Sequence, residues 1–283
     1  MTVFAVILLS PDSVLIRLVE EASPEVDSWT VLFWRGLLYA VGVSLLVFLK
    51  YRLKTLEEFK KIGKGGLLIG LFSGISTGTF VFAIVYTSIA NALVIISTGP
   101  IMIAIVSWFL LKEKSSLVTW ASMVIVFIGI YIVMSGSLGG ENLVGDFFAL
   151  ITAVMMGFTF TLTRKYKDVN MVPVNAIGGV IAALIAYVMA SKISVPPEVI
   201  KYIIAMGVIL SISFSLITIA PRYMPAAEVG MIMPLETVLG SLIAWYVIHE
   251  EPSINALIGG SIVIVTLFCH SWYSTKLARN QLS

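Results

Sequence analysis

Apolar runs long enough to span a membrane recur along the whole chain, with short polar segments between them. A helix needs about 17–25 mostly apolar residues to cross a bilayer. The runs predict helices over residues 2–19, 29–50, 65–87, 90–111, 117–135, 144–163, 172–191, 198–219, 224–248 and 254–274. Because no stretch is left for a soluble domain, the pattern predicts an all-α membrane protein with ten transmembrane helices.

The composition supports the same class of protein. Of the 283 residues 59% are hydrophobic and only 12% are charged, and the mean hydropathy is +1.02. Soluble domains carry about 25% charged residues, so one soluble core of this size cannot hide so many apolar side chains. The single cysteine, Cys269, rules out an internal disulfide.

The sequence carries no motif typical of catalysis or of cofactor binding. It has no HExxH, no Walker loop, no GxGxxG and no metal-ligand spacing. We therefore expect a protein that is not an enzyme, with no cofactor, no metal site and no nucleic-acid partner. Its expected partners are a small-molecule substrate and the lipid bilayer, and its expected state is a monomer or a homodimer.

The basic residues fall mainly on one side of the predicted helices. Fourteen of the 18 lie in alternate loops and helix ends: Lys50, Arg52, Lys54, Lys60, Lys61, Lys64, Lys112, Lys114, Arg164, Lys165, Lys167, Arg222, Lys276 and Arg279. Cytoplasmic loops of membrane proteins carry an excess of Lys and Arg. We expect a multi-pass protein of the cell (inner or plasma) membrane with both termini in the cytoplasm.

Two stretches align when the sequence is shifted by 137 residues. They are ANALVIISTGPIMIAIVSWFLLKEKSS, residues 90–116, and AEVGMIMPLETVLGSLIAWYVIHEEPS, residues 227–253. In each, a helix with a central proline carries an aromatic residue near its end, Trp108 or Trp245. A Glu-containing turn then leads to a second apolar helix. The alignment predicts an internal duplication.

The duplication divides the chain into residues 1–137 and residues 138–283, with five predicted helices each. An odd number of helices makes the second unit enter the membrane in the opposite sense. The expected arrangement is therefore a 5+5 inverted repeat, which is common in secondary transporters whose substrate sites lie near the bilayer midplane.

The two helix pairs also resemble a known family. ANALVIISTGPIMIAIVSWFLLKEK and MPAAEVGMIMPLETVLGSLIAWYVIHEEPSINALIGGSIVIV are similar to the signature helix pairs of EamA-type transporters, of the drug/metabolite transporter superfamily. The resemblance covers essentially the whole chain. It implies a ten-helix transporter of a small metabolite, working by proton-linked exchange or facilitated diffusion, and it does not identify the substrate.

Glu236 is the main candidate for the site, because it lies within an apolar run two residues after Pro234. An acidic group at the bilayer centre costs about 2.5–3.5 kcal/mol on insertion scales. Pro234 in turn frees the carbonyl of Gly230 from its usual helical bond. We expect both residues to line a central cavity in which Glu236 carries protons; the alternative is a proline kink with Glu236 hydrogen-bonded between helices.

Other polar residues within the predicted helices complete the candidate site. Glu228, eight residues before Glu236 and on the same broad helix face, is a second candidate for proton coupling, or else an interfacial acid. Pro11 and Pro100 are further candidate helix breaks. The candidate substrate-binding residues besides Glu236 are Asp12, Arg35, Asn91, Thr98 and Asn175.

Arg17 and Arg35 allow two interpretations. In the first, both are structural and pair with acids such as Glu20 and Glu21. In the second, Arg35 binds a substrate carboxylate in a bidentate manner. The second suits export or exchange of an amino acid or a related zwitterion by alternating access. The alternative function is a polytopic membrane enzyme acting on lipid-linked substrates, although the longest polar loop, 50–64, offers no catalytic set.

Overall fold

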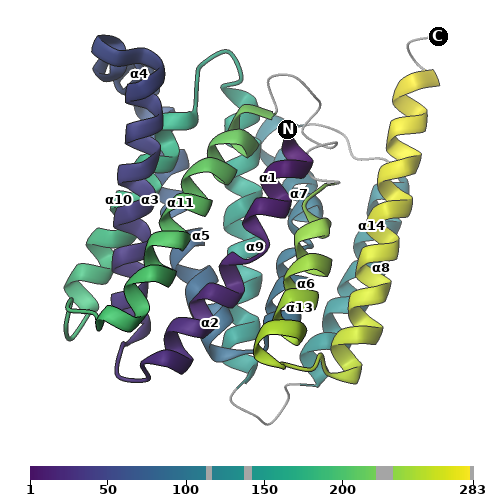
Figure 1. Ribbon diagram of the computed structural model, residues 1–283. Coiled ribbons are helices and arrows are strands. Elements are labelled where there is room, and N and C mark those ends of the chain that lie inside the picture. The colour runs from purple at the N-terminus through teal and green to yellow at the C-terminus, as the bar shows by residue number, and fades with distance from the viewer. Residues whose placement is uncertain (113–116, 137–141, 221–231, 281–283) are drawn as a thin grey trace.

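The computed structural model describes residues 1–112, 117–136, 142–220 and 232–280, and over these residues it contains helices and turns but no strand. The helices stand side by side as an upright bundle (Figure 1). They are α1 (Thr2–Leu9), α2 (Asp12–Ala22), α3 (Ser28–Tyr51), α4 (Thr55–Lys61), α5 (Gly63–Tyr86), α6 (Ile89–Ile96), α7 (Gly99–Leu111), α8 (Leu117–Ser135), α9 (Asn142–Lys165), α10 (Val172–Met189), α11 (Pro197–Ile219), α13 (Pro234–Ile248) and α14 (Ile254–Asn280), with a 3₁₀ turn at Arg52–Lys54.

Every predicted membrane segment contains helix, and the chain is a multi-pass membrane protein. Seven helical segments are long and apolar enough to cross a membrane. Three more helices have shorter apolar segments: Trp120–Ser135 in α8, Leu235–Ile248 in α13 and Ile254–His270 in α14. The exact number of ten crossings therefore stays a prediction.

Two predicted helices are each divided in two. The helix expected over 2–19 breaks between α1 and α2, where Pro11 precedes Asp12, and the helix expected over 90–111 breaks between α6 and α7, just before Pro100. Proline lacks a backbone donor but is favoured in the first turn of a helix. Pro234 is likewise the first residue of α13.

Small residues allow the long helices to approach closely. A Cβ on Gly36 of α3 would lie 2.7 Å from the carbonyl oxygen of Gly179 on α10, and one on Gly74 of α5 would lie 2.9 Å from that of Gly178. Helix α10 thus packs tightly along both α3 and α5. Such contacts are typical of small-residue stripes in membrane helices.

Contacts made by the helices of one half of the chain have equivalents among the helices of the other half. Helix α5 packs on α9 and α10, while α11 packs on α1, α2 and α3; α6 and α7 pack on α9, while α13 packs on α1 and α2. Lys112 and His249, 137 residues apart, end α7 and α13 with the same left-handed backbone, at φ 54° in both. The same local structure recurs at the spacing found by sequence alignment.

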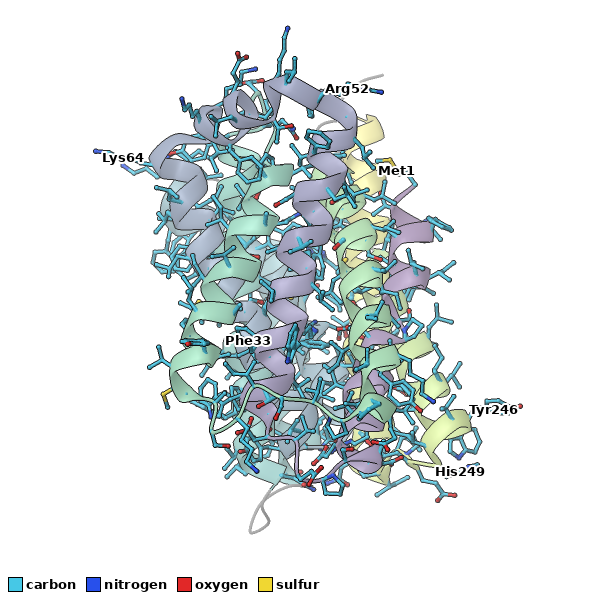
Figure 2. The ribbon with its side chains drawn as sticks, turned by 60° about the vertical axis from the view of Figure 1, so that its left-hand side comes forward. Met1, Phe33, Arg52, Lys64, Tyr246 and His249 are labelled. Atoms are coloured by element: carbon cyan, nitrogen blue, oxygen red, sulfur yellow. The ribbon has the colours of Figure 1, made fainter. Side chains whose placement is uncertain are left out.

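The two ends of the bundle differ in charge. We call the end that carries α4, Met1 and Lys64 the basic end, and the end that carries His249 the acidic end (Figure 2). The acidic end also holds Glu20, at the close of α2, and Glu250.

Candidate functional site: a polar cavity between the helices

A cavity lies at the middle of the bundle, between the break of α1 and α2 and helices α3, α5, α9, α10, α11 and α13. Phe80, Phe160 and Phe214 contribute aromatic walls. Its charged and amide-bearing residues are Asp12, Arg35, Asn175 and Glu236, and its hydroxyl groups come from Ser73, Ser76, Thr77, Tyr39, Thr152, Thr159, Thr163 and Thr218. The structure thus brings together four of the six predicted substrate-binding residues.

Asp12 and Arg35 form a buried ion pair in this cavity. Arg35 Nη2 donates to Asp12 Oδ2 at 2.6 Å, and Arg35 Nε donates to Oδ1 at 3.4 Å. The two side chains are only 1% and 3% exposed. The guanidinium also lies over the ring of Phe80, 5.2 Å from its centroid. The pair satisfies both charges, as buried charges require.

Arg35 keeps one donor free. Its Nη1 is buried and has no hydrogen-bond partner among the described residues, and the same is true of the Thr159 hydroxyl on the facing α9. An unpaired buried donor costs about 1–3 kcal/mol, so a ligand that accepts a hydrogen bond from Arg35 recovers that cost. Arg35 is therefore both a structural partner and a potential ligand-binding group.

Glu236 is the third residue of α13, in the first turn, where the free amides and the helix dipole favour a negative charge. Its side chain lines the cavity, and it makes no hydrogen bond or ion pair with another described side chain. A smaller pocket beside the cavity brings Glu236 together with Ser97, Gly99 and Pro100, at the break between α6 and α7. Glu236 is thus a carboxylate at mid-depth beside two broken helices.

Asn175 faces the same space from α10. Its amide nitrogen donates to the Phe214 carbonyl at 3.2 Å and to the Thr218 hydroxyl at 2.9 Å. Both partners belong to α11, so Asn175 joins α10 to α11 at the cavity wall.

Two predicted substrate-binding residues do not line this cavity. Thr98 is fully buried, and its hydroxyl donates to the Ile95 carbonyl in the preceding turn. Asn91 lies in the first turn of α6, where its backbone N–H donates to the Ser88 hydroxyl near the acidic end. The Thr98 hydroxyl thus bonds within its own helical segment, and a substrate-binding role for Thr98 and Asn91 stays a prediction. Glu228 lies outside the described residues.

The hydroxyl groups of α5 and α9 were missed by sequence analysis. Ser73, Ser76 and Thr77 recur at three- and four-residue spacing on α5, and so lie on one helix face. The spacing would have identified a polar stripe in an apolar helix. Over the described residues, no group of three His, Cys, Asp or Glu comes together.

Comparison with known proteins places this bundle in a family. The EamA-like transporter family matches the chain twice, over residues 2–135 and 143–272. The chain belongs to the EamA-like transporter family. This family is part of the drug/metabolite transporter superfamily, so the resemblance found in the two helix pairs is confirmed.

Three relatives of this EamA-family chain are named as uncharacterized transporters. One from Clostridium kluyveri is 24% identical over 87% of this chain and 84% of its own length. YoaV of Bacillus subtilis is 20% identical over 85% and 87%. One from Methanothermobacter thermautotrophicus is 23% identical over 66% of this chain and 57% of its own length. These matches point to a membrane transporter rather than an enzyme.

A solved structure supports the fold. A crystal structure of a protein that is 17% identical superposes with a TM-score of 0.65, over 100% of this chain and 98% of the other. At this identity the likeness shows the fold alone.

Proposed function

We propose that this EamA-family chain is a secondary transporter that exports or exchanges a small zwitterion, such as an amino acid, by alternating access. The observation that carries the proposal is that one cavity holds a guanidinium donor, Arg35 Nη1, and a carboxylate, Glu236, neither of which has a hydrogen-bond partner among the described side chains. A cargo carboxylate would accept from Arg35, and a cargo ammonium would donate to Glu236. Charge-assisted bonds of this kind are about twice as strong as neutral ones.

The duplicated architecture supports alternating access. The family matches the chain twice, and the contacts of one half have counterparts in the other. Two related units around a mid-depth site allow the site to open to either side in turn. The excess of Lys and Arg supports a cytoplasmic basic end in the cell membrane.

Glu236 also supports proton coupling. An ionisable group inside a membrane protein is expensive to keep and typically marks a proton or substrate path. In this proposal Glu236 releases a proton when cargo binds and regains one when cargo leaves. Glu228 is a second candidate, as the sequence predicts.

The first experiment screens the purified protein for thermal stabilisation by single amino acids. Each hit is compared with its N-acetyl derivative and its methyl ester, which remove the positive and the negative charge in turn. We expect both derivatives to lose the stabilisation. Equal stabilisation by either derivative would contradict a zwitterion site.

The second experiment measures counterflow of the hit in liposomes. We expect Glu236→Gln to lose pH-dependent exchange while remaining folded. Glu198→Gln is the matched control, because Glu198 is an exposed acid in the first turn of α11. Full, pH-dependent exchange by Glu236→Gln would remove Glu236 from the mechanism, and no exchange of any hit by the wild type would overturn the carrier function.

A further inference from the structure

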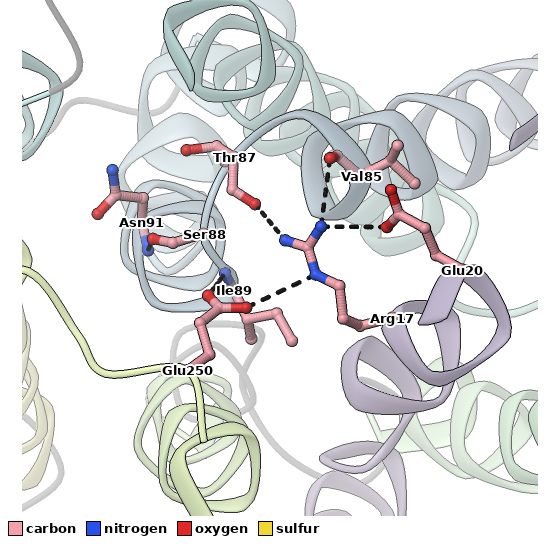
Figure 3. Close-up of polar contacts among 8 residues, drawn as sticks. All are labelled: Arg17, Glu20, Val85, Thr87, Ser88, Ile89, Asn91 and Glu250. Carbon is pink, nitrogen blue, oxygen red and sulfur yellow. Dashed lines mark hydrogen bonds and ion pairs between the residues drawn. The ribbon is translucent and has the colours of Figure 1, made fainter. Parts of the chain in front are cut away.

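The acidic end of the bundle is held by a cluster centred on Arg17, in the middle of α2 (Figure 3). Arg17 Nη2 donates to the Thr87 carbonyl at 2.7 Å, and Nη1 donates to the Val85 carbonyl at 3.3 Å and to Glu20 Oε2 at 3.1 Å. Its Nε lies 3.6 Å from Glu250 Oε2. We call Arg17, Glu20, Val85, Thr87, Ile89 and Glu250 the Arg17 cluster.

The cluster ties together four parts of the chain that are distant in sequence. Glu250, just after α13, accepts a hydrogen bond from the Ile89 amide of α6 at 2.5 Å. The Thr87 hydroxyl donates to Asp146 Oδ1 of α9 at 2.7 Å, and Asp146 is fully buried. Arg17 therefore connects α2 to the α5–α6 turn, and through that turn to α9 and to the segment after α13.

Helix α9 packs directly against the backbone of the α5–α6 turn. A Cβ on Gly145 would lie 2.4 Å from the backbone of Tyr86 and 2.5 Å from that of Thr87. With Arg17 on its other side, the turn is enclosed. This arrangement leaves no room for cargo to pass between α9 and the turn.

The central cavity stops short of the Arg17 cluster. On α5 its lining reaches Phe80, six residues or roughly 9 Å before the helix ends, and on α9 it begins at Thr152, ten residues or roughly 15 Å inside. At the basic end the lining reaches Thr163 and Thr218, within two residues of the ends of α9 and α11. The cavity therefore extends towards the basic end and is closed towards the acidic end.

The hydrogen bonds of Arg17 all come from one guanidinium, so they form together and break together. The Arg17 side chain is 17% exposed, and it bonds two carbonyls at the end of α5, where the helix dipole is negative. When the guanidinium withdraws, both carbonyls lose their partner together. Water can replace it only if the acidic end opens.

We propose that the Arg17 cluster is the closed gate at the acidic end, and that this structure is the state that faces the basic end. Opening requires Arg17 to release the α5–α6 turn, which joins the first half of the chain to Glu250 of the second half. The inference rests on the transport function proposed above, but its test needs no cargo.

The test follows the reactivity of one cavity residue from each end of the bundle. Cys269, the chain's single cysteine, is exposed and is first replaced by serine. Ser76→Cys, which adds a thiol at the cavity wall, is the reporter. A membrane-impermeant thiol reagent is added to sealed vesicles of each orientation. With Arg17 intact, we expect labelling from the basic end and little from the acidic end.

Arg17→Gln should speed labelling from the acidic end about tenfold or more, as expected from the loss of charged hydrogen bonds. Lys192→Gln is the matched control, because Lys192 is an exposed basic residue at the same end whose side chain is outside the cluster. Its labelling should equal that of the parent. If Arg17→Gln does not fold, Arg17→Lys, which keeps the charge but not the forked donors, should still speed labelling by a smaller factor.

Unchanged labelling in a folded Arg17 variant would overturn the gate. Labelling of the parent mainly from the acidic end would overturn the assigned facing state. The experiments distinguish a wrong gate assignment from a wrong transport function. Faster labelling with no transported cargo would support the gate and reject the carrier, and exchange of cargo with unchanged labelling would do the reverse.

Discussion

The guanidinium of Arg35 on α3 lies 2.6 Å from the carboxylate of Asp12, the first residue of α2, and neither side chain is more than 3% exposed. Each charge is the main compensation for the other. Removing one partner of a buried pair is strongly destabilising, because the second charge is left in a poorly solvating place. The pair therefore fixes the break between α1 and α2 against α3.

Asp12→Asn should lower the free energy of unfolding by about 3–5 kcal/mol. The double variant Asp12→Asn/Arg35→Gln should cost less than the sum of the two single changes, because it removes both charges. The coupling energy is obtained from the free energies of unfolding of the parent, the two single variants and the double variant, measured in mixed micelles. Additive losses would show that the two residues do not stabilise each other.

Arg35→Lys should fold nearly as well as the parent but bind cargo about tenfold more weakly. Lysine can keep the ion pair with Asp12, yet it lacks the second arm that leaves Nη1 free for a cargo carboxylate. A thermal-shift titration with the hit from the screen measures the affinity. Binding as tight as that of the parent would show that Arg35 serves Asp12 alone.

Gly36→Ala should destabilise the bundle by about 1–3 kcal/mol. The new Cβ would lie 2.7 Å from the Gly179 carbonyl oxygen and 3.0 Å from the Ala183 amide, so α3 and α10 would have to separate. Gly99→Ala is the matched control, because a Cβ there meets nothing within 4 Å. Thermal unfolding compares the two, and equal melting temperatures would contradict close helix packing at Gly36.

The closed gate should depend on pH through Glu250. Burial raises the pKa of Glu250 above its ordinary range, against the opposing effects of Arg17 and of the hydrogen bond from the Ile89 amide. The charges of Glu21 and Glu20 on α2 raise this pKa further. An opened acidic end would expose Glu250 to water and return its pKa towards normal, so the closed state binds the proton more tightly.

Acidification should therefore favour the closed gate. This stabilisation is complete below the ordinary carboxyl pKa and is lost as pH rises through the raised pKa of the closed state. As the pH is lowered from about 8 to about 5, labelling of the Ser76→Cys reporter from the acidic end should decrease. The decrease should be larger in the parent than in the Glu250→Gln variant. The same fall in both proteins would exclude Glu250 as the group responsible.

Most helices could be predicted from sequence because apolar run length decides whether a segment crosses a membrane. The breaks at Pro11 and Pro100 were also predictable, because proline cannot continue a helix hydrogen-bond ladder. The surface helix α4, Thr55–Lys61, was not predicted, because its short polar sequence lies in a loop with no apolar period.

The pairing of Arg17 with Glu20, three residues along the chain, was among those expected from sequence. The long-range partners of the buried charges could not be predicted. Arg17 and Glu250 are far apart in sequence and meet only because α2 and α13 pack together. Thr98 is predicted to bind substrate because it is a polar residue in an apolar run. A short hydroxyl can instead bond the carbonyl of the preceding turn, and sequence alone does not distinguish the two cases.

The pairing of Asp12 with Arg35 also has an electrical consequence. Among the described residues that line the cavity, these two charges cancel, which leaves Glu236 as the one carboxyl group not paired with a basic side chain. A zwitterionic cargo adds no net charge. Membrane voltage does about 2.3 kcal/mol of work per elementary charge at 100 mV. If Glu236 loses its proton when cargo binds, the voltage would act on the loaded centre through the charge of the Glu236 carboxylate, and a single carboxylate would couple transport to the electrical state of the cell.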